Sequence, residues 1–223
     1  MNEKNFSEIT VETILSVPFQ ENGYLIYRVG NQDCLLVDPG FEPEKIIERV
    51  KNKKLHPIAI LVTHGHADHI AGIDAVKSVW KNCKIYIGEE EKEKLIDAEQ
   101  NLSAPFGFAV TVAPADVLLH DGDKLDLAGI SIEVRHVPGH SKGHVVYFLP
   151  VNSKPILFTG DVIFKQSIGR NDFPDGNPAI QMEAIRSQIL SLPDETIIYA
   201  GHGAVTTVGA ERQTNPYLQF ERK

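Results

Sequence analysis

The sequence predicts an α/β protein in which buried strands alternate with helices and carry polar side chains to one edge of a sheet. Residues 58–62 form a short, apolar, β-branched run preceded by Pro57, which is typical of a buried strand. Apolar residues with helical spacing follow at once, over residues 70–80. Histidines and an aspartate fill the junction between this strand and this helix, so the junction is the first candidate for a functional site.

The beginning of the chain is predicted to form a small sheet and a helix. Gly23 and Gly30-Asn31 separate apolar stretches, so we expect strands over residues 9–18, 23–29 and 33–37. Pro43 then begins a helix that continues to about Leu55, because proline is favoured in the first turn of a helix. The inner face of this helix would contain Ile46, Ile47 and Val50.

After the junction, the pattern predicts a strand over residues 83–87 and a solvated helix face over the charged run 89–94. Residues 101–116 are predicted to be a loop whose Phe106 and Phe108 line a pocket, with a place in the core as the alternative. Residues 117–149 show strands and turns. A last helix is expected from Pro178, with an inner face of Met182, Ile185, Ile189 and Leu192. The chain shows no linker, so we expect one domain over residues 1–223.

The junction contains four side chains able to bind a metal within six positions: His64, His66, Asp68 and His69. His64 and His66 are two residues apart, so an extended backbone would place both rings on the same side. Asp68 is expected to cap the helix that follows. Isolated loop histidines are usually solvated, but imidazole and carboxylate groups in this density are the usual ligands of zinc, iron and manganese.

The second half of the chain repeats one arrangement three times. The apolar runs 130–134, 156–158 and 196–199 each lead through small residues to a side chain suited to a metal. These side chains are His140, Asp161 and His202. Because strand ends in α/β folds meet at one edge, we expect them to join the junction residues there.

Four motifs show a resemblance to a known family: T-H-G-H-A-D-H at 63–69, P-G-H at 138–140, G-D-V-I-F at 160–164 and A-G-H-G at 200–203. With them, nearly the whole chain resembles the metallo-β-lactamase superfamily. The resemblance implies a metallo-β-lactamase fold, a four-layer αβ/βα sandwich of two mixed β-sheets flanked by helices, with a cleft for two metals.

The resemblance also implies the ligands. One divalent ion would take His64, His66 and His140, and the other would take Asp68, His69 and His202, with Asp161 between them. Zinc is the first candidate for both ions, and iron or manganese are the alternatives. Asp68 would also be catalytic, by orienting the attacking water.

Asp38 is expected to support a metal-bound imidazole, because such rings usually donate their other N–H to a carboxylate. His144 could also lie beside the ligands without being one. Structural roles are expected for His56, His120 and His136.

Within the superfamily, the segment 167–174 and the tail after His202 resemble the compact glyoxalase II-type hydrolases, which cleave hydroxyacylglutathione thioesters. Arg170 falls where that family has a basic residue that contacts glutathione, so the resemblance implies substrate binding by Arg170; a loop salt bridge is the alternative. The expected partner is a small-molecule thioester or another anionic thiol conjugate. Only a short tail follows His202, so the helical domain that completes the glutathione site in full-length glyoxalase II is not expected.

Two other functions stay open from the sequence. The chain also resembles iron-dependent persulfide dioxygenases, in which His64, His140 and Asp161 would surround one iron. The second is a metal-binding module without activity. The β-lactamases proper are disfavoured, because they lack a bridging aspartate at the position of Asp161 and are secreted.

Composition limits the remaining possibilities. The chain has 223 residues, of which 42% are hydrophobic and 23% charged, and its net charge of -8 disfavours binding to nucleic acid. Cys34 and Cys83 lie in apolar runs and are expected to be reduced core thiols. Residues 1–8 contain no apolar signal segment, and no run is long enough to span a bilayer. We therefore expect a cytoplasmic protein that does not bind membranes; the sequence does not predict its oligomeric state.

Overall fold

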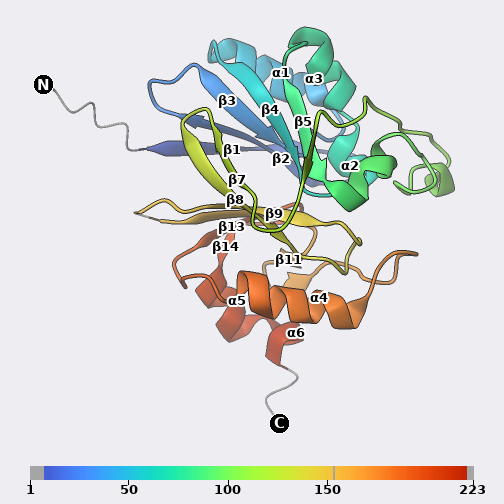
Figure 1. Cartoon of the computed structure of the whole chain (residues 1–223), viewed down its shortest axis with the longest axis vertical. Coiled ribbons are helices and arrows are strands. Elements are labelled where there is room, and N and C mark those ends of the chain that lie inside the picture. The colour runs from blue at the N-terminus through green and yellow to red at the C-terminus, as the bar shows by residue number, and fades with distance from the viewer. Residues whose placement is uncertain (1–7, 153, 220–223) are drawn as a thin grey trace, which may run out of the picture.

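Two six-stranded β-sheets pack face to face, with helices covering the outer face of each, in the computed structural model (Figure 1). The structure describes residues 8–152 and 154–219. Residues 1–7 are outside the described residues. They make up most of the segment 1–8, which was predicted to contain no apolar signal segment. This arrangement is the four-layer αβ/βα sandwich that the sequence motifs predicted.

The first sheet contains the N-terminal strands in chain order: β1 (Ile9–Ser16), β2 (Glu21–Arg28), β3 (Asp33–Val37), β4 (His56–Val62), β5 (Lys84–Gly88) and β6 (Val117–Leu119). Strands β1 to β3 pair antiparallel, whereas β3 to β6 run parallel, so the sheet is mixed. The helices on its outer face are α1 (Pro43–Asn52), α2 (Ala67–Ile70) and α3 (Ile73–Val79).

The second sheet has the order β14 (Thr206–Thr207), β13 (Ile197–Ala200), β10 (Ile156–Gly160), β9 (Val145–Leu149), β8 (Ile130–His136) and β7 (Lys124–Leu127). It is also mixed, because β10 and β13 are parallel and the other pairs are antiparallel. A small hairpin, β11 (Ile163–Phe164) with β12 (Ser167–Ile168), follows β10. The outer helices are α4 (Pro178–Ala184), α5 (Val208–Thr214) and α6 (Pro216–Gln219).

Strand β4 contributes alternate side chains to two hydrophobic clusters, one on each face of the first sheet. Ala59 and Leu61 point into the cluster between the two sheets, whereas Ile60 and Val62 pack in the cluster beneath α1 and α3. Successive strand residues point to opposite faces, so a strand covered on both sides must be apolar throughout. A third cluster lies between the second sheet and its helices. The continuous apolar run in the sequence is therefore explained by burial on both faces.

The two sheets are joined by hydrogen bonds near the edge where the polar motifs gather. The Tyr147 hydroxyl donates to the Val62 carbonyl at 2.7 Å, and the Val145 N–H donates to the Thr63 carbonyl at 2.9 Å. The Tyr24 hydroxyl donates to the Ala200 carbonyl from the other direction. Each bond joins one sheet to the other within a few residues of a predicted ligand.

Several predicted elements needed correction. Gly23 lies inside β2, opposite Ile14, and the turn before β2 is formed by residues 17–20. The predicted helix after the junction is two short helices, α2 and α3, and Asp68 lies in the first turn of α2 without capping it. The break falls at Gly72, whose N–H donates to the Pro39 carbonyl at 2.7 Å. A Cβ at Gly72 would collide with the backbone of Pro39 and Gly40, so this close approach requires glycine.

The end of the chain also differs from the prediction. The helix from Pro178 forms, with the Asn177 side chain as its cap, and it continues as a wider helical turn over Ile185–Ile189. It is not the last helix, because α5 and α6 follow. The Thr207 hydroxyl caps α5, which is a sequence signal that the prediction did not use.

Other predictions are confirmed or stay open. Cys34 and Cys83 are buried and free, as expected. None of the helices in the described part of the chain is long and apolar enough to cross a membrane. The proposal of one domain over residues 1–223 stays a prediction.

Candidate metal centre

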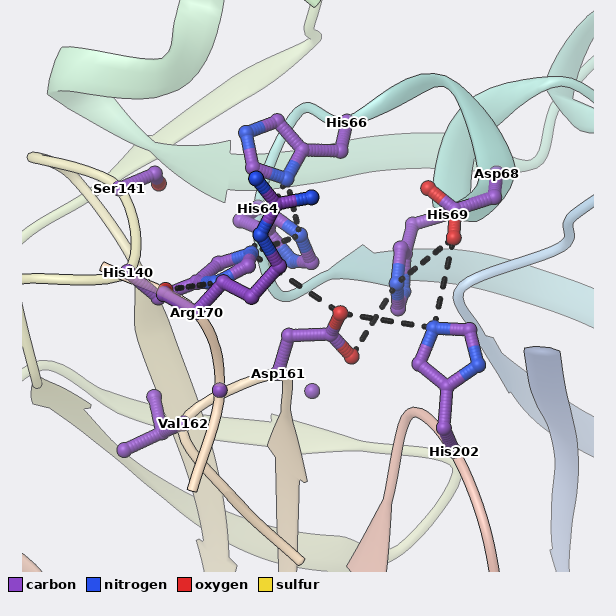
Figure 2. Close-up of polar contacts among 12 residues, drawn as sticks. His64, His66, Asp68, His69, His140, Ser141, Asp161, Val162, Arg170 and His202 are labelled. Atoms are coloured by element: carbon purple, nitrogen blue, oxygen red, sulfur yellow. Dashed lines mark hydrogen bonds and ion pairs between the residues drawn. The ribbon is translucent and has the colours of Figure 1, made fainter. Parts of the chain in front are cut away.

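The seven predicted ligand residues lie together at one edge of the sandwich (Figure 2). His64 and His66 follow the end of β4, and Asp68 and His69 belong to the short helix α2. The second sheet supplies the others from loops at its strand ends: His140 after β8, Asp161 after β10 and His202 after β13. Both sheets therefore contribute side chains to one cluster.

The backbone turns sharply where Asp161 leaves its strand. Gly160 has a φ of 46°, in the left-handed region that favours glycine. A Cβ there would also collide with the Thr63 hydroxyl and the His144 ring. Glycine at this position therefore allows both the turn and the close approach of the two sheets.

Three imidazoles form a compact triangle of nitrogen atoms. His64 Nε2 lies 3.0 Å from His66 Nδ1 and 3.1 Å from His140 Nε2, and the third side of the triangle is 3.0 Å. All three side chains are nearly or completely buried. The structure therefore brings together the three residues of the first predicted ligand set, and their binding of a metal stays a prediction.

Asp161 lies between this triangle and a second group. Its Oδ1 is 3.4 Å from His69 Nε2, and its Oδ2 is 3.4 Å from His202 Nε2 and 3.9 Å from His140 Nε2. Asp68 Oδ2 approaches the second group from α2, at 3.4 Å from His202 Nε2 and 3.8 Å from His69 Nε2. The carboxylate of Asp161 therefore faces both predicted metal positions.

Four of the five histidines in the cluster have their outer nitrogen held by a hydrogen bond. His140 Nδ1 donates to the Arg170 carbonyl at 2.8 Å, and His202 Nδ1 donates to the Gln20 carbonyl at 3.1 Å. A carbonyl can only accept, so each of these bonds assigns a proton to Nδ1 and turns Nε2, the atom that would bind a metal, toward the centre of the cluster.

Asp38 holds the other two rings. Its Oδ2 lies 3.0 Å from His69 Nδ1 and accepts from the Thr63 hydroxyl at 2.6 Å, while its Oδ1 accepts from the Thr63 N–H at 2.8 Å. Because the Thr63 proton is directed to Asp38, the Thr63 oxygen is free to accept from His64 Nδ1, 3.1 Å away. One buried carboxylate thus orients His69 directly and His64 through Thr63. Its support of a metal-bound imidazole stays a prediction.

The residues present fit divalent metal ions. Tetrahedral ligands at a metal–nitrogen distance of ~2.0–2.1 Å lie about 3.3 Å from one another, close to the spacings in both groups. His69 Nε2 and Asp161 Oδ1 are buried and make no hydrogen bond within the described residues. Buried polar atoms without a partner are costly, and a metal ion bound between these two atoms would remove that cost. The chemistry of the donors, imidazole with carboxylate, suits zinc, iron or manganese.

The two groups differ in charge when no metal is bound. Burial, together with neighbouring cationic groups, lowers the pKa of His64 and His66 well below the usual histidine range, and burial lowers that of His140 as well. Burial also disfavours protonation of His202, but hydrogen bonds to Asp161 and Asp68 outweigh it and raise its pKa to about 10. At neutral pH the first group is therefore uncharged and His202 is protonated.

The charged run 89–94 was predicted to be a solvated helix face, and this is wrong for two of its members. It forms a 3₁₀ helix, Glu89–Leu95, in which Glu91 and Lys94 are buried. Glu91 accepts from the Gly65 N–H, the Ser141 hydroxyl and the Gly143 N–H, at 2.6–2.8 Å. Glu91 therefore joins the loop of His64 and His66 to the loop of His140.

His144 is a second residue whose place the sequence could not specify. It is fully buried, stacks on the His64 ring at a centroid distance of 4.6 Å, and accepts the Asp161 N–H at 3.2 Å. It supports two predicted ligands without belonging to either group, as the sequence suggested it could. His120 and His136 lie away from the cluster and bond Glu89 and the Lys142 carbonyl instead. His56 begins β4, at the end of the strand opposite the cluster.

A cavity of about 280 Å³ opens over the cluster. Phe106 and Phe108 line it, as predicted, and so do Phe19, Phe164 and Phe173. Arg170 also lines it, but its exposed guanidinium pairs with Asp172 through two hydrogen bonds of 2.9 and 3.1 Å. The loop salt bridge that was the alternative for Arg170 is therefore present. Substrate binding by Arg170 stays a prediction.

Two mixed sheets with histidine and aspartate side chains at their shared edge define a candidate metal-dependent enzyme. The family model of the metallo-beta-lactamase superfamily matches residues 16–202, and the chain belongs to this superfamily of metallohydrolases.

Individual relatives cover almost the whole chain. The probable metallo-hydrolase YqgX of Bacillus subtilis is 38% identical over 90% of this chain and 93% of its own length. The hydroxyacylglutathione hydrolase GloC of Haemophilus influenzae is 36% identical over 94% of this chain and 98% of its own.

Among solved structures, the BLEG-1 B3 metallo-beta-lactamase has a TM-score of 0.89 at 37% identity, covering 94% of this chain and 100% of its own. TTHA1623 in a di-iron-bound form has a TM-score of 0.81 at 34% identity, covering 93% and 100%.

Replacing Asp38 by asparagine tests its support of the cluster. An amide has only one acceptor oxygen, so Asp38→Asn cannot accept from Thr63 and His69 as the carboxylate does. We expect metal affinity to fall by roughly 10- to 100-fold, measured by competition with a chromogenic chelator. Asp33→Asn, at the other end of β3, is the matched control and should bind as the wild type does. An unchanged affinity in Asp38→Asn would show that the ligands need no such support.

Metal loading should release protons at only one of the two groups. A ligand imidazole must be neutral, so a cation bound by His202 must displace the proton that a pKa of about 10 keeps there at pH 7. The first group is already neutral. Calorimetric titration with zinc in buffers of different ionisation enthalpy should resolve one buffer-independent and one buffer-dependent step. Affinity at the second step should rise with pH up to about 10; two steps without any buffer dependence would contradict the charge assignment.

Proposed function

We propose that the protein is a metal-dependent thioester hydrolase that acts on hydroxyacylglutathione-type substrates. The observation that carries the proposal is the position of Asp161, whose two oxygens face two groups of ligands at the floor of one open cavity. The similarity to GloC, itself described as a hydroxyacylglutathione hydrolase, supports this substrate class.

Each residue has a distinct role in this proposal. His64, His66 and His140 would hold one divalent ion, and Asp68, His69 and His202 the other, with Asp161 between them. The ions, zinc first with iron or manganese as alternatives, would lower the pKa of a bound water and polarise a substrate carbonyl. Asp68 lines the cavity and lies beside His202, so its carboxylate can orient the attacking water as well as bind metal.

Water is the nucleophile in this proposal, so the chain needs no serine or cysteine for it. Cys34 and Cys83 are buried in the core, and burial raises the pKa of Cys83 to about 12. Neither thiol is available as a nucleophile near neutral pH. The leaving thiolate, in contrast, would be released into the open cavity.

Arg170 would bind a carboxylate of the glutathione part. Its guanidinium lies over the Phe173 ring at 4.6 Å, at the rim of the cavity, and Asp172 balances its charge when no substrate is bound. An anionic substrate would compete with Asp172 for the same donors. The Arg170 carbonyl has a separate role, because it holds His140.

Three assays on metal-loaded protein test the function. We expect thiol release from S-lactoylglutathione, no oxygen uptake with glutathione persulfide, and little hydrolysis of a cephalosporin. The β-lactam assay is included because BLEG-1, a B3 metallo-beta-lactamase, is 37% identical. Asp161→Ala should lose bound metal and lower turnover by orders of magnitude, whereas the exposed Asp126→Ala should behave as wild type. Fully loaded protein that consumes oxygen but releases no thiol from the thioester would establish the dioxygenase instead.

Arg170 and Asp172 should have opposite effects on substrate binding. Arg170→Ala removes the cation and should raise KM for S-lactoylglutathione by roughly threefold to tenfold, a modest change because the guanidinium is exposed. Asp172→Asn removes the competing carboxylate and should lower KM. Turnover number and metal content should stay the same in both variants, because the contact is remote from the reacting carbonyl. A thioester without the glutathione carboxylates is the control substrate: an equal loss on it in Arg170→Ala would mean that Arg170 only holds the loop.

A further inference from the structure

The two ends of the metal cluster lie beside different kinds of surface. At the end of His66 and His140, the Phe173 ring packs edge-on against both imidazoles, with centroid distances of 5.0 and 5.4 Å, and Arg170 lies over it. Among the described residues that line the cavity, Arg170 is the one lysine or arginine. This end therefore combines an aromatic face with a positive charge.

The end of His202 is also aromatic, but no lysine or arginine lies there among the described residues that line the cavity. Phe164 lies 6.0 Å from the His202 ring, and Phe19 directly precedes Gln20, whose carbonyl holds His202. Phe108 lies 6.2 Å from Phe19, and both rings line the cavity.

These rings come from separate parts of the chain and support one another. Phe19 lies in the turn between β1 and β2, and Phe108 lies in the loop between β5 and β6. Phe41, in the loop before α1, stacks on Phe19 at 5.2 Å and meets Phe108 edge-on at 5.8 Å. Phe19 nevertheless keeps 38% of its surface exposed. Apolar area left open toward a cavity is area that a ligand can cover.

We propose that the aromatic wall of Phe19, Phe108 and Phe164 binds the acyl part of the substrate, and that the site selects 2-hydroxyacyl groups with an aromatic or other large apolar end. The inference rests on the proposed thioesterase function and specifies its substrate. A thioester has its acyl group and its thiol on opposite sides of the reacting carbon. With the anionic thiol part toward Arg170, the acyl group is directed to the end of His202.

The chemistry of the wall separates two related substrates. A lactoyl group has only a methyl group to place against the three rings. A mandeloyl group has the same hydroxyl and carbonyl but replaces that methyl with a phenyl ring. The ring buries more apolar area and can pack offset or edge-on against the phenylalanines. The glutathione part is identical in the two substrates, so a comparison between them reports on the acyl site alone.

The experiment compares S-mandeloylglutathione with S-lactoylglutathione on metal-loaded wild type, Phe108→Ala and Phe19→Ala. We expect the wild type to favour the mandeloyl substrate in kcat/KM by roughly tenfold, the scale of one well-packed apolar group. Each variant should lose most of that preference, because KM should rise more for the mandeloyl substrate than for the lactoyl substrate. Tyr217→Ala removes a half-exposed aromatic residue that does not line the cavity and is the matched control.

A binding measurement keeps this inference separate from the proposed function. Calorimetry with the free acids should show tighter binding of mandelate than of lactate to the wild type, and a smaller difference in Phe108→Ala. If neither thioester is hydrolysed, the proposed function fails, and the free acids still decide whether the wall selects an aromatic group. The inference is overturned if mandelate and lactate bind equally, if the wild type prefers the lactoyl substrate, or if the variants lose activity equally on both substrates.

Discussion

The site depends on holding imidazole nitrogens close to one another. Three ring nitrogens lie within about 3 Å of one another and are buried away from water, where polar atoms are costly unless they are paired. Such an arrangement persists only if the surrounding structure fixes it. Here part of it is fixed from outside the triangle: the Arg170 carbonyl holds His140, and Asp38 holds His64 through Thr63. The Gln20 carbonyl and Asp38 hold His202 and His69 of the second group in the same way. The spacing of the ligand atoms is therefore set by residues outside both groups.

Fixing the rings also requires fixing the two sheets relative to each other. His64 and His69 follow the first sheet, whereas Asp161 and His202 follow the second, so sliding of one sheet would separate the ligands. The Tyr147–Val62 and Val145–Thr63 hydrogen bonds oppose such sliding close to the site. On the other side, the Asn22 amide donates to the carbonyls of Ala200 and Gly203 around His202. These contacts use backbone groups that would otherwise be unpaired at strand ends.

Much of this structure could be predicted because strands buried on both faces have a clear signature, and because each ligand follows such a strand. The features that could not be predicted come from contacts between distant segments. The helix after the junction is interrupted at Gly72 only because residues 39 and 40 pass close by. Gln20 and Arg170 hold His202 and His140 through their backbone carbonyls, and a backbone carbonyl is present in every residue. The identity of these two side chains therefore could not predict the contacts. Glu91 and Lys94 look like their exposed neighbours until Gly65, Ser141 and Asp175 are placed beside them.

The buried pair inside the charged run affects how readily this segment can change. Glu89, Glu90, Lys92 and Glu93 are exposed, so substitutions there should be nearly neutral. Glu91 accepts from two ligand loops, and Lys94 pairs with both Glu91 and Asp175, so loss of Lys94 would leave the buried Glu91 carboxylate without a cation. Mutational tolerance should therefore alternate sharply within six residues of similar chemistry. A scan of this run would distinguish positions that merely keep the surface charged from those that hold the two loops together.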